Sequence, residues 1–118
     1  MIVDFDSLEE VHAANFKGGE GIVRRTAYAD NAGKIIRLRL VQGSSIGYHV
    51  HENDYEVMYI ISGRAHCIDD GVERELKAGD VHYCPKGHGH SVSNPYEEEL
   101  VIFAVLPAKN SSPATKAE

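Results

Sequence analysis

From position 22 onward, apolar and polar residues alternate in short runs and do not follow helical spacing. The clearest run has Ile36, Leu38 and Leu40 on one parity, with Arg37 and Arg39 between them. Successive side chains of a β-strand point to opposite faces, so this period of two predicts a strand with one apolar face. The pattern leaves open whether that face meets the protein core or a second subunit.

Turn-forming residues separate these runs at short intervals. Gly, Pro, Asn, Asp and Ser gather at positions 43–47, 62–63, 69–71, 78–80, 85–87 and 94–95. Between them lie β-favouring stretches of about five to eight residues, which leave no room for a helix of ordinary length. The pattern predicts an all-β protein, built as an antiparallel sandwich or barrel.

Both ends of the chain depart from this pattern. Ser7 to Glu10 reads S-x-x-E, a capping-box signature that predicts a short helix over Val11 to Ala14, ended by the glycines that follow. After residue 106 the chain is rich in Ser, Ala, Pro, Lys and Asn without apolar rhythm, which is typical of a poorly ordered tail. We therefore expect an N-terminal segment over 1–21, one barrel domain over 22–106 and a flexible tail over 107–118.

Composition and charge narrow the class of partner. The 118 residues suffice for one domain, and 18 acidic against 12 basic residues give a formal net charge of −6. This charge disfavours binding to nucleic acid or to an anionic membrane, since both prefer a basic surface. The longest apolar run, Leu100 to Leu106, is far shorter than the roughly 20 residues of a membrane span. We expect a cytoplasmic protein that binds neither nucleic acid nor a membrane.

The two cysteines add little chemistry. Cys67 and Cys84 lie in strand-like stretches and form neither a CxxC motif nor a zinc-ribbon spacing. We expect both to be ordinary buried thiols.

Histidines are the most informative polar residues. His49 and His51 lie two positions apart, so on one strand they face the same side and bring two imidazoles together. His90 begins a second alternation, through Val92 to Asn94, and would add a further imidazole if that face also points inward.

Glu56 shares its strand face with Met58 and Ile60, after a bend predicted at Asn53 and Asp54. A carboxylate among such apolar neighbours is costly to bury unless a cation neutralises it. A divalent metal held by histidines and Glu56 satisfies this requirement. The alternative is a core glutamate that carries a proton or forms an ion pair.

These residues fall within two spaced patterns. The first, G-x5-H-x-H-x4-E-x6-G, and the second, G-x5-P-x-G-x2-H-x3-N, are filled by Gly43, His49, His51, Glu56, Gly63, Gly79, Pro85, Gly87, His90 and Asn94. Together they resemble the two halves of the cupin superfamily motif, and most resemble small single-domain bacterial cupins of the Cupin 2 conserved-barrel, oxalate-decarboxylase-like type. The resemblance implies a single-domain antiparallel jelly-roll β-barrel, here preceded by a short N-terminal helix or turn. It also implies packing of two subunits into a homodimer.

The same resemblance implies one divalent transition metal bound by His49, His51, Glu56 and His90. Three neutral imidazoles and one carboxylate leave a net charge of about +1 and, in six-coordinate geometry, two open positions. Manganese and iron are favoured by the resemblance, while zinc, nickel and copper suit the same donors.

Around this metal we expect a mostly apolar substrate pocket formed by Met58, Ile60 and Val92. His82 joins it, together with Cys84, if that parity of their strand faces inward; the opposite parity would bring in Val81 and Tyr83 instead. The sequence does not decide between the two.

Other charged residues have weaker patterns. Arg37 and Arg39 could bind a substrate carboxylate, but their alternation favours solvent or a subunit contact. Glu52 and Asp54 are candidate acid or base groups beside the metal motif, or merely solvated loop acids. His88 is interpreted as an exposed turn residue.

The resemblance predicts a small oxygenated or carboxylate-bearing metabolite as ligand, handled by a metal-dependent oxidoreductase, dioxygenase or decarboxylase. Oxalate decarboxylases carry an arginine in the five-residue spacer before the first ligand histidine, and positions 44–48 contain none. Decarboxylation of oxalate itself is therefore disfavoured. Two alternatives stay open: a binding or sensing protein without catalysis, and a sugar isomerase or epimerase whose base would be Glu52, Asp54 or His82.

Overall fold

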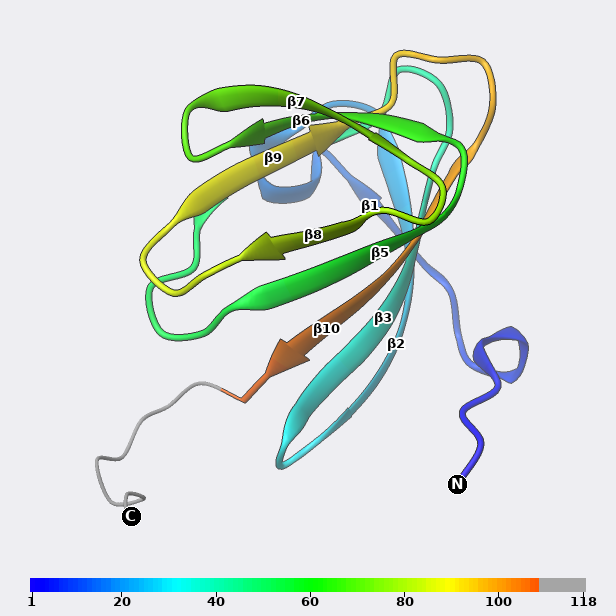
Figure 1. Cartoon of the computed structure of the whole chain (residues 1–118). Coiled ribbons are helices and arrows are strands. Elements are labelled where there is room, and N and C mark those ends of the chain that lie inside the picture. Colours follow the sequence, from blue (N-terminus) through cyan, green and yellow to red (C-terminus); the bar gives the residue numbers. More distant parts are fainter. Residues whose placement is uncertain (109–118) are drawn as a thin grey trace.

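The computed structural model describes residues 1–108, and its strands form two antiparallel sheets that enclose one core (Figure 1). One sheet has the order β1-β2-β3-β10-β5-β8 and the other β4-β9-β6-β7. The strands are β1 (Val11–Ala14), β2 (Ile22–Asp30), β3 (Gly33–Leu40), β4 (Ser45–Val50), β5 (Glu56–Ser62), β6 (Arg64–Asp69), β7 (Val72–Lys77), β8 (Val81–Cys84), β9 (Gly89–Ser93) and β10 (Leu100–Pro107). Two short 3-10 helices, η1 (Phe5–Ser7) and η2 (Phe16–Gly18), flank β1. The all-β jelly-roll prediction is confirmed.

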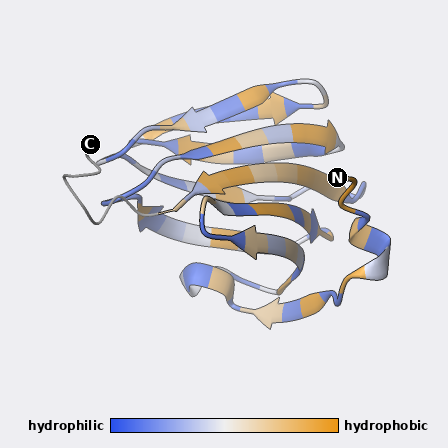
Figure 2. Ribbon diagram, turned by 90° about the horizontal axis from the view of Figure 1, so that it is seen from below, coloured by the Kyte–Doolittle hydropathy of each residue, from blue (hydrophilic) through white to orange (hydrophobic). Residues whose placement is uncertain are grey.

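The core lies between the inner faces of the two sheets. Ile36, Leu38 and Leu40 of β3 are buried there, opposite Ile102 and its neighbours on β10. Apolar and polar residues alternate along the strands as Figure 2 shows, because only one face of each strand meets the core. The apolar face of β3 therefore serves the core, which settles the question that its sequence pattern left open.

The helix predicted over Val11 to Ala14 is wrong. These residues form β1, whose Ala13 pairs with Val23 of β2. The capping-box residues are engaged elsewhere: the Ser7 hydroxyl donates to the carbonyl of Asp4, and Glu10 forms an ion pair with Arg39. Pairing with an exposed sheet edge supplies more backbone hydrogen bonds than one isolated helical turn would.

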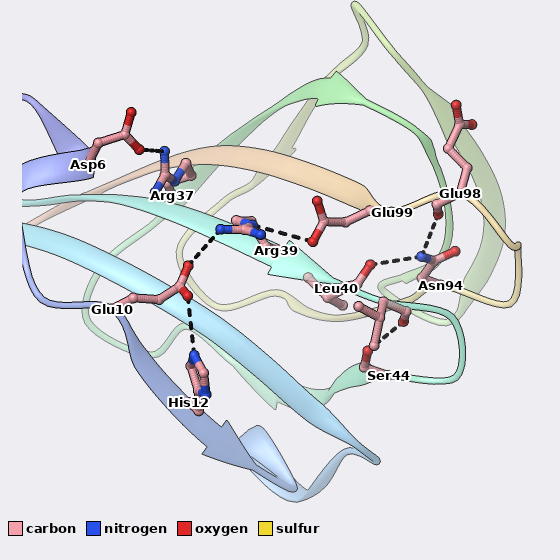
Figure 3. A network of polar contacts seen from close by, with 11 residues as sticks. Asp6, Glu10, His12, Arg37, Arg39, Leu40, Ser44, Asn94, Glu98 and Glu99 are labelled. Carbon is pink, nitrogen blue, oxygen red and sulfur yellow. Dashed lines mark hydrogen bonds and ion pairs between the residues drawn. The ribbon is translucent and has the colours of Figure 1, made fainter.

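Arg37 and Arg39 lie on the outer face of β3 and connect it to the N-terminal segment (Figure 3). Arg37 Nη1 lies 2.9 Å from Asp6 Oδ1, and Arg39 contacts Glu10 at 3.0 Å and Glu99 at 3.3 Å. The ring of Phe5 packs edge-on to Phe103 of β10, with centroids 6.3 Å apart. Both arginines are therefore occupied by carboxylates on the side of the sheet away from the histidines.

The C-terminal end of the described chain is still part of the sheet. Strand β10 extends through Pro107, and the Ala108 N–H donates to the carbonyl of Ala32 at 2.8 Å. The rest of the predicted tail, 109–118, lies outside the described residues. Within residues 1–108 no helix has the length and apolar character needed to cross a membrane.

Candidate metal centre

A change of register between β4 and β9 places the first histidine. Ile46 pairs with Val92 and His49 pairs with His90, so β4 has one residue more than β9 between the two pairs. Without this irregularity, Ile46 and His49 would lie on opposite faces of the strand. With it, both side chains point inward, and His49 and His90 become direct cross-strand neighbours.

His51 lies just beyond β4 and is held by the turn before β9. Its backbone N–H donates to the carbonyl of His88 at 3.0 Å, and its own carbonyl accepts from the Gly87 N–H at 2.6 Å. Gly87 has φ of +86°, a conformation that glycine adopts without strain, and Pro85 accepts the bond that closes the turn. The turn motif therefore positions His51 as well as His90.

Glu56 enters from the opposite sheet as the first residue of β5. A bend at 52–53 separates it from His51, close to the bend predicted at Asn53 and Asp54. Glu56, His51 and His90 are all buried, and His49 is half-buried.

Four donor atoms converge at this point. His51 Nε2 lies 3.1 Å from His90 Nε2 and 3.1 Å from Glu56 Oε1, and His90 Nε2 lies 3.2 Å from His49 Nε2 and 3.0 Å from Glu56 Oε1. One ligand atom from each of the four residues lies within 4.8 Å of the others.

The opposite nitrogen of each imidazole has its own partner. His49 Nδ1 contacts the carbonyl of Gly47 at 2.8 Å, and His51 Nδ1 contacts Asp54 Oδ1 at 2.9 Å. Both partners accept hydrogen bonds, so each Nδ1 carries a proton and, when the ring is neutral, its Nε2 lone pair faces the centre. His90 Nδ1 lies 3.0 Å from Nε2 of the buried His82, which can accept in the same way.

The surroundings of Glu56 keep it ionised. Burial acts to raise its pKa, but hydrogen bonds with His51 and His90 and the charges of both rings outweigh it and lower the pKa to about 2. The hydrogen bond with Glu56 raises the pKa of His51 against the effect of burial, whereas burial lowers the pKa of His49. The lowered pKa favours a Glu56 carboxylate over the alternative of a protonated core glutamate.

These observations fit a metal ion. Zn–N bonds of about 2.0–2.1 Å place neighbouring donor atoms roughly 2.9–3.4 Å apart, depending on the bond angle, and the four contacts of 3.0–3.2 Å fall in this range. Lone pairs facing one another at such distances repel unless a cation lies between them. A proton on His51 would satisfy Glu56, but the contact of His49 with His90 would then need a second proton between the two Nε2 atoms. The cluster can hold a divalent metal.

A cavity of about 800 Å³ opens beside the cluster. His49, His51 and Glu56 lie in its wall with Met58, which was predicted to line the pocket. Ile60 and Val92 are packed in the core and are not among the residues of the cavity wall.

The structure decides the parity of β8: His82 and Cys84 are buried, while Val81 and Tyr83 are exposed. His82 lies behind His90, with its Nε2 3.9 Å from Cys67 Sγ, and is not in the cavity wall. Direct contact of His82, Ile60 or Val92 with a substrate stays a prediction.

The remaining polar candidates take different roles. Asp54 bonds to His51, and Glu52 lies exposed in the cavity wall. His88 is an exposed turn residue 3.1 Å from Asp70 and lies outside the cluster, as predicted. The hydrogen-bond partners of the three Nδ1 atoms were not predicted. Only the folded backbone brings Gly47 and His82 beside the ligand histidines. Asp54 lies three residues after His51, and this spacing was the one indication of such a partner in the sequence.

Fold and site together define the class of this protein. The Cupin domain family model matches residues 36–106, more than half of the chain, and the protein belongs to the cupin family. All four residues of the cluster lie within the matched range.

Relatives extend the likeness to almost the whole chain. An oxalate-binding protein of Thermotoga maritima is 31% identical over 112 residues, covering 90% of this chain and 93% of the relative. The crystal structure of a predicted oxalate decarboxylase from Thermotoga maritima superposes with a TM-score of 0.86 at 31% identity, covering 92% of this chain and 99% of that one. An uncharacterised double-stranded β-helix protein from Klebsiella pneumoniae matches with a TM-score of 0.75 at 25% identity, covering 94% and 92%.

Proposed function

We propose that this cupin binds one divalent transition metal, manganese or iron, through His49, His51, Glu56 and His90. The observation that carries the proposal is the arrangement of the three imidazoles, whose Nδ1 atoms are engaged elsewhere. The Nε2 atoms of His51 and His90 lie 3.0–3.1 Å from Glu56 Oε1, and His49 Nε2 lies 3.2 Å from His90 Nε2. Nitrogen and oxygen donors of this kind suit both metals. The preference for manganese or iron rests on the cupin resemblance.

The test replaces one ligand and one matched histidine. His51→Ala should lose the metal, because it removes a donor and leaves Glu56 partly uncompensated. His88→Ala is the control, since His88 is exposed and lies outside the cluster. Metal content per chain, measured by inductively coupled plasma mass spectrometry, should be near one in the wild type and in His88→Ala. Full metal content in His51→Ala would refute the ligand assignment.

We also propose that a small carboxylate-bearing metabolite binds to the metal from the cavity. The Thermotoga maritima relative is named an oxalate-binding protein, which supports this class of ligand. A bound divalent ion supplies a Lewis acid for a carboxylate oxygen. Isothermal titration of the manganese-loaded protein with oxalate and other small acids tests the proposal, and absence of binding by every acid would contradict it.

Whether turnover follows binding depends on an available base. Three residues were candidates for this base: Glu52, Asp54 and His82. Asp54 bonds to His51 and His82 faces His90, so Glu52 is the one candidate that does not contact a histidine of the cluster. This favours binding, or decarboxylase or oxygenase chemistry centred on the metal, over a sugar isomerase or epimerase. Carbon dioxide release or oxygen uptake during a screen of small acids would support an enzyme. Binding without either would support a non-catalytic function.

A homodimer is proposed on separate grounds. Tyr59 and Ile61 of β5 and Val81 and Tyr83 of β8 are exposed on the outer face of their sheet, and a second copy could cover them without burying a charge. Light scattering should give twice the chain mass for the wild type and the chain mass for Tyr83→Glu. A monomeric wild type would contradict the proposal. The cytoplasm stays the proposed compartment, since both cysteines are buried free thiols.

A further inference from the structure

One arginine lies on the inner face of the larger sheet. Arg25 of β2 pairs with Leu38 of β3, and the next pair on the same parity is Val23 with Leu40. Paired residues of antiparallel strands point to the same side, and Leu38, Val23 and Leu40 are all buried in the core. The side chain of Arg25 therefore starts from the core-facing side of the sheet, where the neighbouring positions Val23, Leu38 and Leu40 are apolar.

Arg25 has no anionic partner within residues 1–108. Its Nε is buried and makes no hydrogen bond, and its guanidinium lies over the ring of Phe16 at 5.2 Å. Arg37 Nε is likewise buried without a hydrogen bond, but Arg37 contacts Asp6 through Nη1, and the outward-facing Arg39 contacts Glu10, as Figure 3 shows. The lack of any carboxylate partner therefore distinguishes Arg25 from these two arginines. A buried, unpaired guanidinium nitrogen destabilises the fold, so stability alone does not account for Arg25.

Arg25 and the metal cluster share one cavity. The wall of the 800 Å³ cavity includes Arg25 and Phe16 together with His49, His51 and Glu56. Lys17 and Lys34 add positive charge to the same wall. The wall also contains four carboxylates, of which those of Asp54 and Glu56 face histidines; the other two belong to Asp30 and Glu52. An anion that reaches Arg25 would meet a guanidinium that is already partly desolvated and has no competing partner.

We propose that Arg25 binds a second carboxylate of the ligand and thereby selects diacids longer than oxalate. The inference rests on the proposed function, in which the first carboxylate meets the metal. Oxalate can bring both carboxylates to one metal and leaves none for Arg25, whereas a longer diacid can occupy both sites. Guanidinium suits this role because it presents parallel N–H donors to the two oxygens of a carboxylate.

The experiment titrates manganese-loaded protein with oxalate, malonate, succinate and glutarate. Arg25→Met keeps the length of the side chain but removes its charge, and Arg24→Met is the matched control, since Arg24 pairs with the outward-facing Arg39. For the longer diacid that the wild type binds most tightly, we expect Kd to rise about 10- to 100-fold in Arg25→Met. We expect the Kd of oxalate to stay within about twofold and Arg24→Met to match the wild type in both.

Stability and metal content separate this effect from a general disruption. Arg25→Met should keep the metal and should not lower Tm, because it replaces an unpaired polar group by an apolar one. The inference is overturned if the protein binds none of the diacids longer than oxalate, or if the binding of such a diacid does not depend on Arg25. It is also overturned if dependence on Arg25 is confined to a phosphate monoester such as phosphoglycolate. If the wild-type protein binds neither oxalate nor any longer-chain diacid, the proposed function is refuted and the inference with it.

Discussion

At the scale of single residues, the centre depends on the protonation of its imidazoles. A histidine binds a metal only through an unprotonated nitrogen, so protons and metal compete for each Nε2. In the metal-free protein, the hydrogen bond with Glu56 raises the pKa of His51 above 6.5, while burial lowers the pKa of His49. His51 is therefore protonated at a higher pH than His49.

We predict that metal affinity falls as the pH decreases through the range around 6.5 that is ordinary for histidine. Affinity should be constant well above the raised pKa of His51 and should decline steadily below it. Equilibrium dialysis against manganese at a series of pH values from 5 to 8 measures this dependence. Undiminished occupancy well below pH 5 would contradict ligation by histidine.

His82 offers a second prediction at this scale. Its Nε2, 3.0 Å from His90 Nδ1, holds the His90 ring so that its Nε2 faces the metal. His82→Phe removes the acceptor and should weaken metal binding about 10- to 100-fold. His82→Gln keeps an acceptor oxygen and should recover part of the affinity. His66→Phe is the control, because His66 lies on β6 of the other sheet and outside the metal cluster. Wild-type affinity in His82→Phe would show that His82 only fills space.

At the scale of elements, a buried motif residue at the end of a strand joins that strand to its neighbours. Asn94 follows β9 and is buried, although it contacts neither the metal cluster nor the cavity. Its amide nitrogen donates to the carbonyls of Leu40 and Glu98 at 2.9 Å (Figure 3). Its amide oxygen accepts from the Tyr96 N–H at 2.9 Å. The motif asparagine thus joins the end of β3 to the loop before β10.

We predict that Asn94→Ala lowers the free energy of unfolding by about 2–4 kcal/mol, because it leaves buried backbone groups without partners. The exposed Asn31, in the turn between β2 and β3, provides the control substitution Asn31→Ala, for which a change below about 0.5 kcal/mol is expected. Urea denaturation of the metal-free forms measures both. Equal stability of the two variants would contradict the structural role of Asn94.

The same scale explains what the sequence could and could not predict. Two-residue periodicity was sufficient to bring His49 and His51 to one side, whereas the full set with Glu56 and His90 was anticipated through the resemblance to the cupin motif. The bulge that turns Ile46 and His49 to the same side has no separate signal, since alternation alone would place them on opposite faces.

Two further elements show why local patterns were insufficient. The parity of β8 was undecided because both parities offer plausible core residues, and only pairing of Cys84 with Glu56 on β5 fixes it. The helix expected over Val11 to Ala14 failed because a local capping signature competes with tertiary pairing, and pairing with β2 prevailed. Arg25 likewise resembles any strand arginine until its register with Leu38 is known.

At the scale of the whole molecule, the cluster joins the two sheets. His49 and His90 belong to the four-stranded sheet, Glu56 belongs to the six-stranded sheet, and His51 lies in the connection between them. A metal bound by all four would therefore link the two sheets beside the open cavity. Binding to the folded state alone adds stability that depends on the free metal concentration.

We predict that metal stabilises the whole fold, not only its site. At a free metal concentration of about 100 times Kd, the free energy of unfolding should increase by about 2.7 kcal/mol, which corresponds to a rise in Tm of roughly 10 °C for a chain of this size. Differential scanning calorimetry with and without a chelator measures the shift, and His51→Ala should show little of it while His88→Ala shows all of it. An equal response to metal in both variants would mean that the ion stabilises the protein from another site, and the link between the sheets through His49, His51, Glu56 and His90 would have to be abandoned.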